Sequence, residues 1–219
     1  MIEAVIFDMD GTLLDTLTDL ANCCNYALRV NGYKEHSIDE VKFFVGNGFA
    51  KLIERALPQG RANRDYQKVF NDASSYYAQH YRDNTKCYDG ITQTIQALNQ
   101  RGIKTGIVSN KPDARVKELA ELYFKGYIDS STAVGDRKGF NIKPSPDTVL
   151  EVIRILKVNK DNVLYVGDSD VDILTAQNAG LRCISVTWGF RDRDFLIAHK
   201  ATTLIDKPQQ LLEIVQNYR

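Results

Sequence analysis

Two aspartates that follow an apolar run are the residues of this chain best suited to chemistry. The segment Ala4–Phe7 is entirely apolar and predicts a buried β-strand. Asp8 and Asp10 come directly after it, with one residue between them. Two carboxylates this close repel each other, and partial burial adds a desolvation cost. A bound cation or a shared proton would relieve both costs; the alternative is an ordinary strand end with an acidic, glycine-containing turn.

Three more polar segments lie after predicted strands. Ser109 and Asn110 stand directly before a predicted helix, where a hydroxyl and an amide either hold phosphate oxygens or cap the helix. Lys143 precedes Pro144, which keeps it extended, and it is either a site residue or a solvated lysine. The segment 168–172 carries several carboxylates, which is unusual after a strand unless something positive is bound.

The elements that must position these groups alternate between strand and helix from about residue 89 onward. Apolar runs predict strands at 103–108, 127–129, 162–166, 183–186 and 204–205. Helical spacing predicts helices at 91–102, 112–122, 146–157, 170–179 and from about 208. This alternation predicts an α/β fold whose parallel sheet is covered by helices on both faces. Because such sheets bind ligands beyond the carboxyl ends of their strands, all four polar groups can converge there.

Residues 16–83 show helical spacing only, and the first strand belongs with the later ones. The helical block is therefore an insertion. We predict a discontinuous α/β core domain, residues 1–15 and 84–219, and an all-helical domain, residues 16–83. Within the block, Gly46-Asn47-Gly48 is a flexible break between two helices.

The run FDMDGTLLDT, residues 7–16, resembles the first signature of the haloacid-dehalogenase-like (HAD) phosphohydrolase superfamily, DxDGT. The other polar segments match the second, third and fourth signatures of that superfamily in chain order: Ser109, Lys143, and Asp168 with Asp172. The resemblance covers the whole chain, because the helical block lies where the superfamily has its small helical cap. It implies a Rossmann-like core with an inserted cap domain.

The resemblance also implies a mechanism. Asp8 would attack phosphorus and form an aspartyl-phosphate, while Asp10 would protonate the leaving oxygen and then activate water. A phosphate dianion and a carboxylate nucleophile repel each other, so the site needs a hard cation with oxygen ligands, and Mg²⁺ fits that need. The implied ligands are the carboxylates of Asp8 and Asp168 and the backbone carbonyl of Asp10.

Further residues take supporting roles by the same resemblance. Lys143 would balance charge on the transferring phosphoryl group, and Asp172 would orient Lys143 or a metal-bound water. The phosphoryl oxygens would be held by Gly11, Thr12, Ser109 and Asn110. Asp10 and Asp168 also separate the chain from metal-free dehalogenases and from ion-pumping ATPases, which have Thr at the position of Asp10.

Two segments resemble the phosphoglycolate-phosphatase-like branch of the superfamily: VGNGFAKLIERAL, residues 45–57, and VTWGF, residues 186–190. By that resemblance the loop of Gly46, Asn47 and Gly48 faces the site, and small flexible residues suit a lid over a small ligand. A plain interhelical turn is the alternative. Three residues of the helical block either meet a substrate carboxylate or are solvated: Lys42, Lys51 and Arg55.

Other functions stay open at this stage. A phosphosugar mutase of the same capped type would need cap groups that bind a sugar, and no positive sign of them stands out. A pyrophosphatase or a nucleotidase of the same branch is a further possibility. A non-catalytic binding protein would be marked by loss of Asp8, Asp10 or Lys143, and all three are present.

The composition narrows the class of protein. The 219 residues carry 28 basic and 28 acidic side chains, so the net charge is zero and nothing steers the chain to nucleic acid or an anionic membrane. The first residues lack a basic region and a cleavage site, so we expect no signal peptide. The four cysteines match no zinc pattern and no CxxC motif, as in a reduced cytoplasmic protein. We expect a monomer or weak homodimer whose partner is a small phosphorylated metabolite.

Overall fold

The computed structural model describes residues 1–217, which fall into two compact units. One unit combines Met1–Leu13 with the chain from Cys87 onward, and the other is Leu14–Lys86. The chain therefore leaves the first unit and returns to it once. The sequence predicted this division at residues 15/16 and 83/84, two or three residues from each observed boundary.

The larger unit is built on a six-stranded sheet in which every neighbouring pair is parallel. The order of the strands is β5-β4-β1-β6-β7-β8. Their bounds are β1 Ala4–Phe7, β4 Lys104–Pro112, β5 Ala133–Asp136, β6 Val163–Gly167, β7 Arg182–Val186 and β8 Leu204–Ile205. All four residues of β1, at the centre, are buried, as expected for a strand covered on both faces. The sheet confirms the predicted α/β fold.

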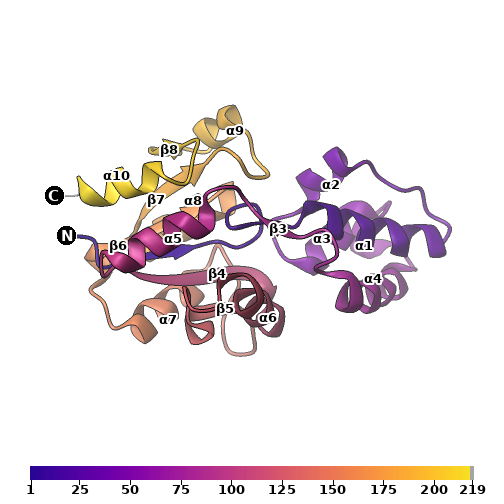
Figure 1. Ribbon diagram of the computed structural model, residues 1–219. Helices are drawn as coiled ribbons and strands as arrows, with labels where there is room; N and C mark the ends of the chain where they lie inside the picture. Colours follow the sequence, from indigo (N-terminus) through magenta and orange to yellow (C-terminus); the bar gives the residue numbers. More distant parts are fainter. Residues whose placement is uncertain (218–219) are drawn as a thin grey trace. The chain divides into compact units, whose positions relative to one another are not determined.

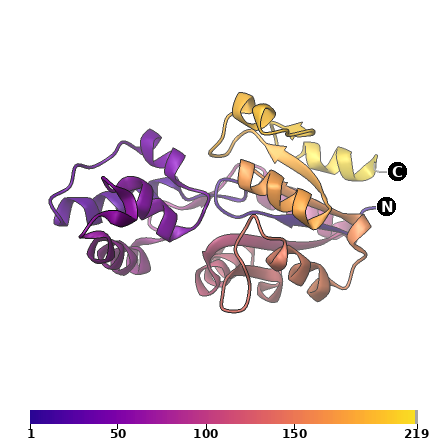
Figure 2. The same cartoon turned by 180° about the vertical axis from the view of Figure 1, so that it is seen from behind.

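Helices cover both faces of this sheet, as comparison of Figure 1 with Figure 2 shows. The helices of this unit are α5 Ile91–Gln100, α6 Asp113–Phe124, α7 Asp147–Leu156, α8 Asp170–Ala179, α9 Arg193–Ala198 and α10 Gln210–Gln216. One apolar core joins side chains of β1, β4 and β6 to side chains of α7 and α8. Gly106 permits this packing, because a Cβ there would lie 2.5 Å from a methyl carbon of Val152.

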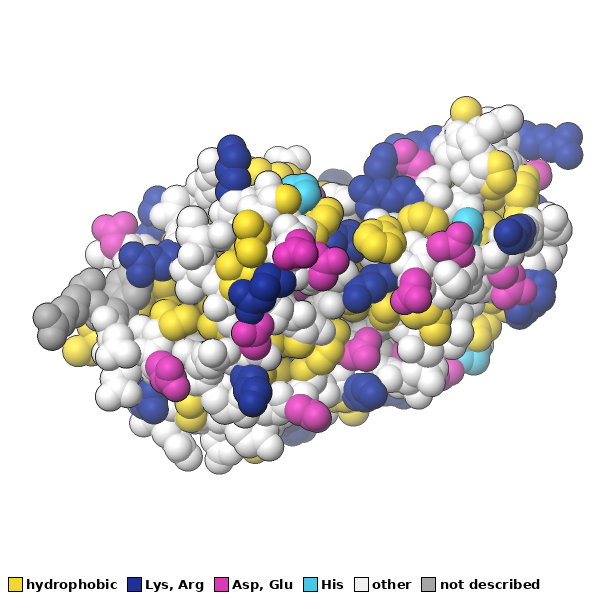
Figure 3. Space-filling model, turned by 90° about the horizontal axis from the view of Figure 1, so that it is seen from above, with side chains coloured by type: hydrophobic (Ala, Val, Ile, Leu, Met, Phe, Trp, Pro, Cys, Tyr) yellow, Lys and Arg dark blue, Asp and Glu magenta, His cyan; other side chains and the backbone are white. Residues whose placement is uncertain are grey.

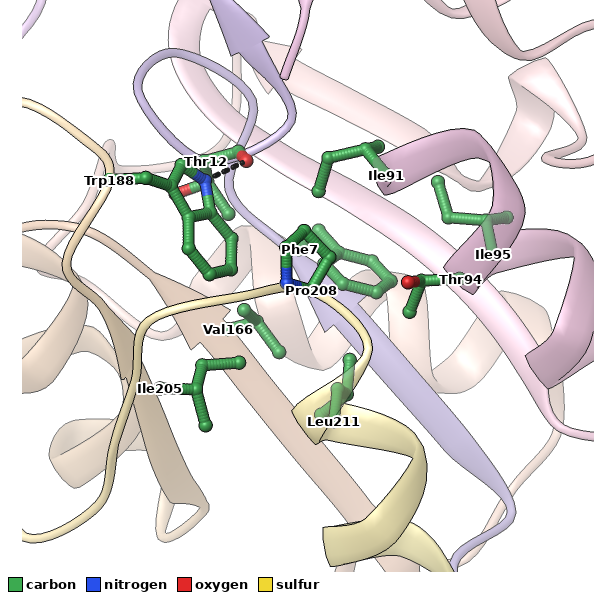
Figure 4. Close-up of a pocket in the computed structure, with 10 residues that line it drawn as sticks. All are labelled: Phe7, Thr12, Ile91, Thr94, Ile95, Val166, Trp188, Ile205, Pro208 and Leu211. Atoms are coloured by element: carbon green, nitrogen blue, oxygen red, sulfur yellow. Dashed lines mark hydrogen bonds between the residues drawn. The ribbon is translucent and has the colours of Figure 1, made fainter. Parts of the chain in front are cut away.

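The opposite face of the sheet carries a small apolar cavity between β1, β6, α5 and α10 (Figure 4). Phe7, Ile95 and Leu211 are among the side chains that point into it. Its volume is about 10 Å³, enough for one water molecule at most. The Trp188 indole lies at its edge and donates a hydrogen bond to the Thr12 carbonyl, 3.0 Å away.

The predicted strand at 127–129 is wrong. The strand lies at β5, and before it Asp129 accepts a hydrogen bond from the Ser131 amide and starts a short 3₁₀ turn, Ser130–Thr132. The apolar pair Tyr127-Ile128 resembled a strand, but Ile128 instead packs as a buried residue of the connecting turn. Strand β4 also extends four residues beyond its predicted end, 108, to Pro112.

The smaller unit contains the helices that the sequence predicted for residues 16–83. They are α1 Leu17–Val30, α2 Ile38–Phe44, α3 Phe49–Ala56 and α4 Tyr66–His80. Helix α2 begins at Ser37, whose side chain forms a capping box with Glu40. Two short strands, β2 Leu14–Asp15 and β3 Lys86–Cys87, pair where the chain enters and leaves the helices.

A buried carboxylate ties the first helix of this unit to its last segment. Asp19 in α1 is 2% exposed and accepts hydrogen bonds from the backbone amides of Asn84 and Thr85 at 2.9 Å each. It also accepts from their side chains, at 2.8 Å each. A carboxylate can accept this many bonds because it has about four lone-pair sites.

Within residues 1–217, each helix is too short or too polar to cross a membrane. On the face drawn in Figure 3, basic and acidic side chains are interspersed rather than gathered by sign. All four cysteines lie among the described residues and form no disulfide.

The Asp19 contacts predict a large loss of stability on truncation. Asp19→Ala leaves several buried donors unpaired, so we expect the free energy of unfolding to fall by about 3 kcal/mol. Urea unfolding measures this change. Asp19→Asn is the matched control, since it keeps one carbonyl acceptor and should lose less. Equal stability of Asp19→Ala and the wild type would show that these bonds contribute nothing net.

Candidate active site

Asp8, the first site residue, continues the hydrogen bonding of the central strand by one residue. Asp8 follows β1, and its amide donates to the Val166 carbonyl of β6 at 2.8 Å. Asp168 follows β6, the neighbour of β1. The carboxyl ends of two adjacent parallel strands therefore bring these two aspartates together, as the sequence predicted.

Lys143 lies between two carboxylates. Its ammonium group is 2.6 Å from Asp8 Oδ1 and 2.8 Å from Asp172 Oδ1, and its side chain is only 3% exposed. The Tyr165 hydroxyl accepts from Lys143 at 3.3 Å and donates to Asp172 Oδ1 at 3.0 Å. The other oxygen of Asp172 accepts from the Ser169 amide and hydroxyl, at 3.1 and 2.6 Å. Asp172 is therefore fully engaged in holding Lys143 and the start of α8.

Asp168 fits closely into a cradle of two glycines. Its carboxylate accepts from the Thr12 hydroxyl at 3.2 Å and from the Phe190 amide at 2.7 Å. A Cβ at Gly11, where φ is +87°, would lie 2.3 Å from Asp168 Oδ2. A Cβ at Gly189 would lie 2.3 Å from the Asp168 Cβ. Both positions therefore need glycine to admit this carboxylate.

Asp10 contacts the end of β4. Ser109 donates to Asp10 Oδ2 at 3.2 Å, and the Lys111 ammonium lies 3.1 Å from Asp10 Oδ1. The sequence did not identify Lys111 as a site residue, because its pattern predicts that the strand ends at 108. In a strand that continues to Pro112, residues two apart share a face, so Ser109 predicts the direction of Lys111.

The Asn110 side chain lies on the opposite face of the same strand. Its amide nitrogen donates to the Lys143 carbonyl at 3.0 Å, and its oxygen accepts from the Lys143 amide at 2.7 Å. Asn110 thus fixes the backbone that carries Lys143. Its expected contact with phosphate stays a prediction, as do the phosphate contacts of Gly11, Thr12 and Ser109.

Burial governs the charge state of the cluster. Burial and the Asp172 carboxylate raise the pKa of Asp8 well above its usual value. The same two causes raise the pKa of Asp168 to about 7. Burial opposes the charged form of Lys143, yet the Asp172 and Asp8 carboxylates outweigh it and raise the pKa of this lysine, which keeps it cationic.

The donor set fits a hard cation. One carboxylate oxygen each from Asp8, Asp168 and Asp172 lies within 4.8 Å of the others. Oxygen ligands of this kind suit Mg²⁺ or Ca²⁺, and a divalent charge would favour the ionised carboxylates and so oppose the rise of their pKa values. Asp172 already accepts four hydrogen bonds, as many as a carboxylate has lone-pair sites, whereas Asp168 accepts two, so Asp8 and Asp168 are the better ligands.

The loop predicted to face the site belongs to the helical unit. Gly46, Asn47 and Gly48 connect α2 to α3, and Asn47 accepts from Arg55 at 2.8 Å. Lys51 pairs with Glu54. These bonds lie within the helical unit, so contact of the loop, Lys42, Lys51 or Arg55 with a substrate stays a prediction.

Comparison with known proteins gives consistent matches. The sequence profile of the haloacid dehalogenase-like hydrolase family matches residues 5–186. The chain is 31% identical to the phosphoglycolate phosphatase of Aquifex aeolicus over 99% of this chain and 98% of that protein. It is 32% identical to the phosphoglycolate phosphatase of Vibrio parahaemolyticus, over 98% and 96%. A crystal structure from Lactobacillus delbrueckii subsp. bulgaricus superposes with a TM-score of 0.93 at 34% identity, covering 97% of this chain and 98% of that one.

The raised pKa of Asp168 predicts how stability depends on pH. In the unfolded chain an aspartate has a pKa near 3.9, whereas in the folded protein the pKa of Asp168 is about 7. The folded state therefore binds this proton more tightly, which stabilises it at low pH, and this stabilisation is lost as the pH rises through about 7. We expect the free energy of unfolding of the metal-free protein to fall by about 2 kcal/mol from about pH 5.5 to 8 through this group. Denaturant unfolding in a chelator measures it.

Asp168→Asn is the control, because its amide does not titrate. Its free energy of unfolding should change less over the same pH range. A decline of the same size in both proteins would contradict a raised pKa at Asp168.

Proposed function

Because this chain belongs to the haloacid dehalogenase-like hydrolase family, we propose that it is a Mg²⁺-dependent phosphatase that hydrolyses a small phosphomonoester through an aspartyl-phosphate. The observation that carries the proposal is the pairing of two aspartates with separate partners. Asp8 lies against Lys143 and near Asp168, while Asp10 lies against Ser109 and Lys111. These separate partners support attack by one carboxylate and proton transfer by the other.

In the first step Asp8 attacks phosphorus. A bond forms between its carboxylate oxygen and phosphorus, and the ester bond to the leaving oxygen breaks. Asp10 gives its proton to that oxygen, so the alcohol leaves neutral. Lys143 and the Ser109 hydroxyl stabilise the charge that develops on the phosphoryl oxygens.

In the second step water replaces the aspartate. Asp10, now ionised, takes a proton from the water, which attacks phosphorus and releases phosphate and Asp8. When bound at Asp8, Asp168 and the Asp10 carbonyl, Mg²⁺ supplies positive charge that reduces the repulsion between phosphate and carboxylate. Asp172 and Tyr165 hold Lys143 in place throughout.

The relatives support a substrate for this chemistry. The two relatives compared above, from Aquifex aeolicus and Vibrio parahaemolyticus, match nearly the whole chain and are phosphoglycolate phosphatases, so we place phosphoglycolate first among the candidates. The cap loop Gly46-Asn47-Gly48 would then close over this small ligand. A cytoplasmic location and a monomeric or weakly dimeric state stay predictions alongside this assignment.

A phosphate-release assay tests the proposal. We expect Mg²⁺-dependent release from phosphoglycolate and slower release from sugar phosphates, nucleotides and pyrophosphate. A chelator should abolish it, and Asp8→Asn should too, because an amide is neither a nucleophile nor a good Mg²⁺ ligand. Full activity in chelator, or in Asp8→Asn, would refute the mechanism.

Asp10→Asn separates the two steps. We expect turnover to fall roughly 10²–10⁴-fold, the usual contribution of a general acid–base group. With a good leaving group such as p-nitrophenol, the first step needs no acid, so phosphoenzyme should accumulate and be seen by mass spectrometry as a phosphate on Asp8. Wild-type rates with no trapped phosphoenzyme would exclude Asp10 from both roles.

A further inference from the structure

Lys111 is a second buried cation in the site, and the mechanism above gives it no task. Its side chain is 4% exposed, and its ammonium lies 3.1 Å from Asp10 Oδ1. Lys143, by contrast, contacts Asp8 and Asp172. The two ammonium groups therefore serve different carboxylates. Burying a second charge carries a desolvation penalty, which calls for a reason.

The backbone holds Lys111 in a defined position. Its amide donates to the Ser109 hydroxyl at 3.2 Å, and its carbonyl oxygen would lie 2.5 Å from a Cβ at position 135, which is glycine. Strand β5 therefore packs directly against the backbone of Lys111. A side chain that starts from a fixed backbone and is buried loses little further freedom on binding a ligand.

The position of Lys111 marks the side of the leaving group. In the proposed reaction phosphorus bonds to Asp8, and the leaving oxygen comes within hydrogen-bond distance of Asp10. Lys111 contacts Asp10 Oδ1, so atoms attached to a leaving oxygen at Asp10 come near its ammonium. A carboxylate carbon two covalent bonds of about 1.5 Å from that oxygen falls within reach of an ammonium placed there.

The charges of the active site favour binding of an anionic group next to Lys111. Lys143 contacts Asp8 and Asp172, which lie close to Asp168, whereas Lys111 has Asp10 as its carboxylate partner. When the substrate enters while Asp10 still holds its proton, Asp10 offsets the Lys111 charge less, so an extra anionic group is attracted to Lys111 and repelled by the three carboxylates on the other side.

We propose that Lys111 is the residue that makes the enzyme select phosphomonoesters with a carboxylate on the carbon next to the ester oxygen. This inference rests on the proposed phosphatase function and assigns its substrate class to one side chain. The substrates are phosphorylated 2-hydroxycarboxylates, of which phosphoglycolate is the smallest. The Lys111 ammonium pairs with the substrate carboxylate while it remains beside Asp10.

A pair of substrates that differ only in the carboxylate tests the proposal. The quantity compared is the ratio of kcat/KM for phosphoglycolate to kcat/KM for ethyl phosphate. Wild type should prefer phosphoglycolate, and Lys111→Met should lower the ratio roughly 30-fold or more, as expected when one partner of a buried charge pair is truncated. Lys111→Arg should retain part of the preference, because a guanidinium also pairs with carboxylates.

Lys117→Met is the matched control. Lys117 lies on α6, pairs with Asp113 and is half-exposed, so the same change there should leave the ratio as it is. If Lys111 only positions Asp10, Lys111→Met lowers both rates equally and the ratio stays constant, which would overturn the proposal. A wild-type enzyme without preference for phosphoglycolate would also overturn it.

A binding measurement removes the chemistry from the test. 3-Phosphonopropionate has the shape of phosphoglycolate, and propylphosphonate lacks its carboxylate; neither is hydrolysed. Calorimetry with Mg²⁺ present should show tighter binding of the first compound to wild type and a loss of that difference in Lys111→Met. If wild type hydrolyses p-nitrophenyl phosphate but binds both phosphonates equally, the selectivity proposal fails while the phosphatase function stands. Absence of any Mg²⁺-dependent hydrolysis would instead refute the function.

Discussion

The rest of the site depends on the crowding of buried carboxylates around one ammonium group. Asp8, Asp168 and Asp172 each bring an oxygen within 4.8 Å of the others, and Lys143 neutralises only part of their charge. In a buried environment such repulsion is costly, so the carboxyl groups retain protons unless another cation is present. Burial, together with the nearby Asp172 carboxylate, raises the pKa values of Asp8 and Asp168. A divalent cation bound at this cluster would offset the repulsion.

The fold supplies what lets these groups approach one another. Parallel strands end side by side, and glycines occupy positions where the backbone passes close to the carboxylates. At Gly167 a Cβ would lie 2.3 Å from the Asp172 side chain, and Gly11 and Gly189 play the same part for Asp168. Tyr165 and Ser169 then satisfy the oxygens of Asp172. The glycines leave room for the carboxylates, and the hydroxyl groups donate hydrogen bonds to them. Together they stabilise a cluster whose members repel one another.

Part of the site could be predicted from sequence because its chemistry is local. Carboxylates directly after an apolar run identify Asp8, and the α/β alternation places Asp168 beside it. Lys111 was not predicted because the last residues of β4 are polar and do not resemble a strand. Unless the strand is known to continue, the sequence does not show which way the Lys111 side chain points. Tyr165 resembles a core aromatic residue in an apolar strand, and only the fold shows its hydroxyl against Lys143. The mistaken strand at 127–129 has a similar origin: short apolar pairs do not distinguish a strand from a buried turn.

Measuring proton release on Mg²⁺ binding tests most directly whether repulsion makes the buried carboxyl groups retain protons. Titration calorimetry at about pH 7, repeated in buffers of different ionisation enthalpy, counts the protons exchanged on binding. If Asp8 and Asp168 hold protons that a cation replaces, Mg²⁺ binds one site with net release of protons, and Asp168→Asn reduces that release. Mg²⁺ binding without proton release, or the absence of binding, would contradict the view that repulsion among these carboxylates prepares the site for a metal ion.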